Sequence, residues 1–246
     1  MNQTLAIARA VLADAVRRKV IWVVLVFAAL LAFAIPMLPN YGGEVVSAVY
    51  REITLALMFT AALIVGLALA ATRIPGEVER RTVFSLLARD VRRWHYIVGS
   101  WLGMFLVTGI VIAAFVVIAI ACGMLVYHQP MLVLIEGAIA IWLETGVIMA
   151  LTVLASSRFN PVTAVIAALA FIFIGHSISG VLGFGGEGQP ATPWWLPSLD
   201  AFNVINPIAH GGGVSPVYIG SMVLTFVALA GLLLVGASAA FSGRDL

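Results

Sequence analysis

The sequence predicts an all-α membrane protein, a polytopic bundle of six transmembrane helices in a single domain, residues 1–246. First, 63% of the 246 residues are hydrophobic and only 10% are charged, whereas about a quarter of a soluble domain is charged. Second, the chain contains six apolar windows of about 20 residues or more, the helical length that crosses a bilayer. Third, these runs are continuous, unlike the short alternating segments of a membrane barrel. The windows are 20–38, 53–72, 97–126, 131–155, 161–183 and 217–241.

Residues 1–19 precede the first window and are predicted to form an amphipathic helix on the membrane surface. At 100° per residue, its apolar and polar side chains fall on opposite sides. This pattern is typical of an interfacial helix, and it fits a simple anchor and a mechanical role equally well. A cleaved signal peptide is disfavoured, because its charged region would be unusually long and would contain Asp14. The apolar side consists of Leu5, Ala8, Val11, Leu12 and Val16.

Lys and Arg residues are distributed asymmetrically about the predicted spans. If the N-terminus is cytoplasmic, 12 of the 13 basic residues lie on the cytoplasmic side and only Arg51 lies outside. Because positive residues in short loops stay in the cytoplasm, we expect a multi-pass protein of the cytoplasmic (inner) membrane with both termini inside. The basic residues follow the membrane edges, where they meet anionic lipid of the bilayer. The sequence has no basic patch with interleaved aromatic residues apart from the spans, so no nucleic-acid partner is predicted.

The charged segment 73–96, RIPGEVERRTVFSLLARDVRRWHY, carries nine of the 24 charged residues and is the predicted long cytoplasmic loop. Pro75 and Gly76 are expected to interrupt the helix that leaves the membrane. Glu77 and Glu79 would then begin a new helix, because acidic side chains stabilise a first turn. A plain connector needs only a few residues, so the length of this loop favours a surface that binds a partner. The apolar stripe of the new helix consists of Val83, Leu86 and Leu87.

The run PGEVERRTVFSLLARDVRRWHYIVGSWLG resembles the cytoplasmic segment of type-2 ABC exporter permeases. In that family a Glu-rich turn, an R-T pair, an L-L pair and an R-W pair precede a third span that contains Gly. The six spans, the interfacial helix and the long outer segment are similar to the family too, in particular to its nitrous-oxide-reductase maturation group. The resemblance implies the transmembrane permease subunit of an ABC transporter, an exporter. It indicates no cargo, because relatives handle drugs, lipids, polysaccharides and the maturation of copper enzymes.

The resemblance also implies partners. In such permeases the short helix after the second span is the coupling helix, which binds a separate ATPase subunit, and a second permease copy or homologue completes the assembly. Independently, a P-loop needs a lysine in G-x-x-x-x-G-K-[ST], and the only lysine, Lys19, lies between Arg18 and Val20. We therefore expect a non-enzymatic chain without a cofactor, and ATP with magnesium in the partner. The implied ATPase contacts are Glu77, Glu79, Arg80, Arg81, Thr82, Val83, Leu86 and Leu87.

Two ionisable residues are predicted near the middle of the membrane, where such groups are costly. By helical rise, Glu144 lies roughly 16 Å from the cytoplasmic end of its span, and His176 lies at a similar depth. The two side chains either line a substrate or proton pathway or bond two helices together, and helix bundles commonly use polar pairs in the second way. Glu136 lies close to the outer end of the same span and is expected to reach the outer interface.

The outer segment 186–216 differs in composition from the spans. Its five prolines exclude a long helix, and Trp194 and Trp195 are typical of a membrane interface. The stretch SLDAFNVINPIAH is expected to form one or two short turns, capped by Ser198 or Asp200. A loop this long usually has a role, either roofing the exit path or acting as a simple lid.

Enzymatic readings find little support. His176 and Ser177 are neighbours about 100° apart on one helix, so they cannot meet as base and nucleophile. The four histidines show no H-E-x-x-H spacing, and Cys122, the only cysteine, has no internal disulfide partner. Gly99-x-x-x-Gly103 predicts a close helix contact. The alternative to a permease is a non-transporting scaffold or receptor subunit, which would have no ATPase partner.

Overall fold

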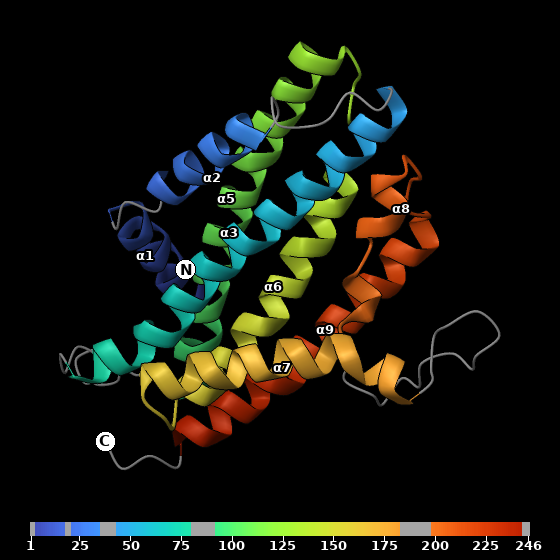
Figure 1. The fold of residues 1–246 in the computed structure, drawn as a ribbon. Coiled ribbons are helices and arrows are strands. Elements are labelled where there is room, and N and C mark those ends of the chain that lie inside the picture. Colours follow the sequence, from blue (N-terminus) through green and yellow to red (C-terminus); the bar gives the residue numbers. More distant parts are fainter. Residues whose placement is uncertain (1–2, 18–20, 35–42, 80–91, 183–197, 243–246) are drawn as a thin grey trace.

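The computed structural model describes residues 3–17, 21–34, 43–79, 92–182 and 198–242, and within these ranges all regular structure is helical. Figure 1 shows α1 and α2 at one flank of the bundle, α8 and α9 at the other, and α6 between them. The predicted all-α class is confirmed. The helices are α1 (Gln3–Arg17), α2 (Ile21–Ala34), α3 (Gly43–Glu79), α5 (Arg93–Tyr127), α6 (Leu134–Ser156), α7 (Pro161–Leu182), the 3-10 helix η2 (Asp200–Phe202), α8 (Ile205–Ala209) and α9 (Pro216–Ser242).

Five helices, namely α3, α5, α6, α7 and α9, are long and apolar enough to cross a membrane. They correspond to the second to sixth predicted windows. The first window contains α2, which has 14 residues and measures about 21 Å by helical rise. Residues 35–38 of that window lie outside the described residues. Together these helices make the chain a multi-pass membrane protein.

Helix α3 is longer than predicted and continues through Pro75 to Glu79. The prediction that the helix breaks at Pro75 and Gly76 was wrong. A proline lacks the amide proton of a helical bond and crowds the preceding turn, which normally favours a break. Here other contacts hold the turn, because Ile74 is fully buried and Arg73 forms an ion pair with Glu77 one turn later. The acidic pair therefore ends α3 instead of beginning a new helix.

The core is built around α6. Of its most apolar stretch 78% is buried, against 17% for α7 and for α9. Phe105 of α5 stacks with Trp101 of its own helix, with Trp142 of α6 and with Phe226 of α9, and Trp101 also stacks with Phe226. The Trp101 indole donates to the Gly146 carbonyl at 3.0 Å, and the Trp142 indole donates to the Phe105 carbonyl at 2.9 Å. These two bonds set the relative depth of α5 and α6.

Helix α1 packs on the beginning of α5, at the predicted Gly99-x-x-x-Gly103 contact. A Cβ atom added at Gly103 would lie 2.6 Å from Val11 Cβ and 2.8 Å from the Ala8 carbonyl oxygen. At Gly99 it would lie 2.9 Å from the backbone of α1. The two glycines therefore admit α1 of the same chain, and this close contact is internal to the chain.

The buried side of α1 differs in part from the predicted apolar side. Ala8 and Val11 are buried as expected, whereas Leu5 is 48% exposed and Ile7 is buried in its place. The helical angle of 100° per residue places Leu5 on the apolar side of the helix, but it does not specify from which direction α5 packs. That direction determines that Ile7 is buried and Leu5 is not. At the far end of the helix, Asp14 forms an ion pair with Arg73 of α3 at 3.0 Å.

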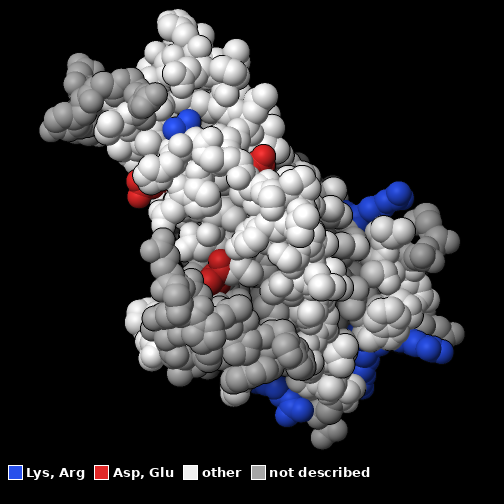
Figure 2. All heavy atoms as spheres, turned by 90° about the vertical axis from the view of Figure 1, so that its right-hand side faces the viewer, with Lys and Arg blue, Asp and Glu red and all other residues white. Residues whose placement is uncertain are grey.

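One end of the bundle gathers three chain segments around two arginines. Arg93, at the start of α5, donates to the carbonyls of Phe241 and Ser242 at 3.3 and 2.7 Å. Arg158, in the turn between α6 and α7, donates to the Ala240 carbonyl at 3.0 Å. We call this the basic end. Figure 2 shows Lys and Arg side chains gathered mainly in the lower half of the face seen there.

The opposite end is closed by the segment that precedes α9. The Glu136 carboxylate accepts a hydrogen bond from the Val214 amide at 2.6 Å. Arg51 donates to the Ala209 carbonyl at the end of α8, with a nitrogen to oxygen distance of 3.0 Å. Glu136 thus holds the chain segment that precedes α9 against the beginning of α6, and its reach to the outer interface stays a prediction. The predicted short turns within residues 198–210 are present as η2 and α8.

Candidate functional site

Glu144 and His176 meet between α6 and α7. His176 Nε2 and Glu144 Oε1 are 2.8 Å apart, a distance at which a proton on Nε2 is donated to the carboxylate. The Glu144 side chain is only 5% exposed, because it projects from the central helix, and the His176 side chain is 30% exposed. The pairing expected from their similar depths is confirmed. Its part in a pathway stays a prediction.

A second carboxylate, Asp200, lies on the other side of the imidazole. Asp200 Oδ1 is 3.8 Å from His176 Nδ1. The Ser198 hydroxyl donates to Asp200 Oδ2 at 3.1 Å and accepts from the Asp200 amide at 3.2 Å, which holds the Asp200 carboxylate in place; the N-cap position of η2 is Leu199, so the predicted cap by Ser198 or Asp200 was wrong. The Leu199 amide donates to the Gly175 carbonyl at 3.0 Å, which attaches the outer segment to α7 directly beside the histidine.

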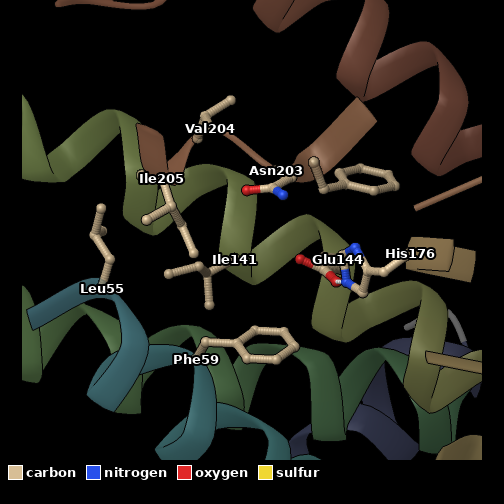
Figure 3. Close-up of a pocket in the computed structure, with 10 residues that line it drawn as sticks. Leu55, Phe59, Ile141, Glu144, His176, Asn203, Val204 and Ile205 are labelled. Atoms are coloured by element: carbon tan, nitrogen blue, oxygen red, sulfur yellow. Dashed lines mark hydrogen bonds and ion pairs between the residues drawn. The ribbon is translucent and has the colours of Figure 1, made fainter. Parts of the chain in front are cut away.

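A cavity of about 230 Å³ adjoins this polar cluster. Figure 3 shows Leu55 and Phe59 of α3 facing Ile141 of α6, with Glu144 and His176 together to one side. Apart from Glu144 and His176, the side chains that line the cavity are apolar except for the amide of Asn203. The residues that line it are Leu55, Phe59, Gly137, Ile141, Glu144, His176, Phe202, Asn203, Val204 and Ile205.

The chemistry available here is that of a carboxylate and an imidazole in a largely apolar chamber. Such a pair can hold a proton between its members or accept a hydrogen bond from a bound molecule. Within the described ranges, no group of three or more His, Cys, Asp or Glu side chains is arranged to hold a metal ion. The cluster is a polar site at one side of a largely apolar cavity.

A separate polar network joins three helices at the basic end. Arg73 of α3 pairs with Asp14 of α1 and with Glu77 of its own helix. The Tyr96 hydroxyl of α5 donates to Glu77 Oε2 at 2.6 Å. Glu77, predicted as a contact for a partner, thus makes contacts inside the chain and its side chain is only 16% exposed. Glu79 is exposed at the end of α3.

Six further residues predicted to contact a partner lie outside the described residues. They are Arg80, Arg81, Thr82, Val83, Leu86 and Leu87.

The family model described as ABC-2 family transporter protein matches residues 5–246, which include every described helix from α2 to α9 and nearly all of α1. This chain belongs to the ABC-2 transporter family. The ABC-2 protein is accordingly a membrane permease subunit of an ABC transporter, as the resemblance implied. The narrower similarity to nitrous-oxide-reductase maturation permeases stays a prediction. No curated protein matches the chain closely enough to count as a relative.

Sequence reasoning missed several residues of the ABC-2 protein's polar site. Asp200 was expected only as a helix cap, since 24 residues separate it from His176 and no periodicity links them. Leu55 and Phe59 read as ordinary apolar residues of a span. Only Glu144 and His176 carried a signal in the sequence, because ionisable groups are rare at the middle of a membrane span.

Proposed function

We propose that this chain is the permease subunit of an ABC exporter, driven by a separate ATPase subunit that holds ATP and magnesium. The match of residues 5–246 to a transporter family carries the proposal. The sequence supports the division of labour, because its only lysine, Lys19, does not lie in a P-loop motif. In this proposal a second permease copy or homologue completes the membrane part.

The ATPase binds at the basic end, which faces the cytoplasm. The positive-inside rule supports this orientation, since Arg73, Arg93 and Arg158 lie at that end. The chain runs from the end of α3 at Glu79 to the beginning of α5 at Arg93 through residues 80–92, which include six of the eight residues predicted to contact the ATPase. Glu77 joins the last turn of α3 to α5 through Tyr96. A force applied to the segment would therefore reach both helices.

The proposal is tested by charge reversal at two exposed carboxylates of the same helix. Glu79→Arg lies at the basic end of α3, and Glu52→Arg lies at the opposite end. We expect Glu79→Arg to weaken co-purification with a co-expressed ABC ATPase by about tenfold, since interface charges of this kind are worth roughly 1 kcal/mol or more. Glu52→Arg should co-purify as the unaltered chain does.

Two results would contradict the proposal. One is ATP hydrolysis by the purified chain alone, because the ATPase would then not be a separate subunit. The other is undiminished ATPase binding by a chain in which Glu79, Arg80 and Arg81 are all reversed in charge. A chain that binds no ABC ATPase under any condition would instead favour a scaffold or receptor subunit.

A further inference from the structure

We propose that the cavity beside Glu144 binds an apolar molecule that carries one protonated amine, with Glu144 accepting the hydrogen bond of that amine. That the bound molecule is the transported cargo rests on the proposed permease function. That it binds in the cavity does not depend on that function. Three observations carry it: the shape and lining of the cavity, an unused carboxylate oxygen, and the balance of charge.

The lining favours a compact apolar body. Leu55, Phe59 and Ile141 form one wall, and Val204 and Ile205 belong to the segment opposite. Ligand pockets are typically apolar with a few polar groups that fix the orientation of the ligand. The volume of about 230 Å³ suits a small molecule or the head of a larger one.

The Glu144 carboxylate has one oxygen available to a ligand. Oε1 is 2.8 Å from His176 Nε2, and among the described residues no donor is hydrogen-bonded to Oε2. The side chain is nevertheless only 5% exposed and lines the cavity. Because Glu144 lines a largely apolar cavity, a hydrogen-bond donor on a bound molecule would be stabilised by its carboxylate there.

The charge around the cavity favours a cation over an anion. Glu144 and Asp200 flank a single imidazole, so with both carboxylates ionised the cluster of three carries an excess of negative charge even when His176 is protonated. Among the residues that the structure describes, no Lys or Arg lines the cavity. The aromatic rings of Phe59 and Phe202 also line the cavity and can contact an ammonium group favourably.

The test uses three probes that share one apolar cage and differ in head group: 1-adamantylamine, 1-adamantanol and 1-adamantanecarboxylate. Each is equilibrated at pH 7 with the full chain in lipid nanodiscs, without ATPase or nucleotide, and bound probe is measured by dialysis. Empty nanodiscs give the amount dissolved in lipid. We expect the amine to bind about tenfold more tightly than the alcohol, because a hydrogen bond to a charged group is worth more than a neutral one.

Variants locate the binding. Glu144→Gln keeps the size of the side chain and a carbonyl oxygen for His176, and it should reduce amine affinity about tenfold, to that of the alcohol. Glu136→Gln is the matched control, because this carboxylate lies on the same helix but bonds the Val214 amide outside the cavity lining. It should bind the amine as the unaltered chain does. Ile141→Phe narrows the cavity and should weaken both amine and alcohol.

Equal binding of amine and alcohol would overturn the proposal, and so would an amine affinity unchanged in Glu144→Gln. If Glu144→Gln does not fold, judged by its elution profile and melting curve, the head-group comparison and Ile141→Phe decide. Binding is measured without the ATPase, so a chain that prefers the amine yet recruits no ATPase would refute the proposed function and leave this site standing. Loss of the preference in a chain that does recruit an ATPase would refute the site alone.

Discussion

The substitution Gly103→Ala is expected to loosen α1 from α5. The added Cβ would lie 2.6 Å from Val11 Cβ, and ordinary contacts begin at 3.4 Å, so the two must separate by roughly 0.8 Å. The Ala8 carbonyl oxygen, 2.8 Å away, belongs to the backbone, so the helix must move as a unit. Overpacking of this kind costs about 1–3 kcal/mol, and the better helix propensity of alanine returns about 1 kcal/mol. We expect a net loss of about 1 kcal/mol in the free energy of unfolding.

Gly231→Ala is the matched control, because a Cβ at that position meets no atom within 4 Å. It should leave stability unchanged or raise it by up to about 1 kcal/mol. Unfolding is followed by circular dichroism during titration with sodium dodecyl sulfate. In parallel, a cysteine replacing Val11 in a Cys122→Ser background reports exposure through its rate of maleimide labelling. Gly103→Ala should accelerate labelling, and Gly231→Ala should not. Equal stability and equal labelling in both variants would refute the assigned contact.

Three further substitutions test the bonds that hold the bundle, each by the same unfolding assay. Trp101→Phe removes the indole bond to α6 and should cost about 1–3 kcal/mol, whereas Trp94→Phe, at an exposed site, should cost less than about 0.5 kcal/mol. Tyr50→Phe removes a buried hydroxyl bond to α5 of 2.7 Å and should cost about 1 kcal/mol; no measurable change would contradict that bond. Asp14→Asn weakens the ion pair with Arg73 and should cost less than about 1 kcal/mol, with a smaller difference in high salt; a difference that grows with salt would contradict an electrostatic origin.

The positions of the membrane helices were largely predictable from sequence, for a physical reason. Whether a segment of about 20 residues can reside in the bilayer depends on its own hydrophobicity, not on its neighbours. The second to sixth windows therefore contain long helices, and the first window contains the shorter α2. Helix ends depend on other contacts, and there the prediction failed: α3 passes through Pro75 because burial of Ile74 and the Arg73 pairing with Glu77 stabilise the turn.

The candidate site was predictable only in part. Glu144 and His176 were found because charge is costly in a membrane, and their similar predicted depth made pairing geometrically possible. Depth does not specify which helices are neighbours, so the meeting of α6 and α7 required the structure. Nothing local marked Asp200 as the third member of the cluster, because its approach depends on how the outer segment folds back onto α7.

By itself, the sequence determined that this protein is a helical bundle in a membrane, which segments are apolar enough to enter it, and which residues of those segments are ionisable. Hydrophobic length and charge are properties of each segment and are readable one segment at a time. Only the tertiary structure decided that Gly99 and Gly103 receive α1, that Glu77 bonds Tyr96, and that two carboxylates flank one histidine beside a cavity. Each of those outcomes depends on which distant segments pack together, and hydropathy and periodicity do not encode that choice.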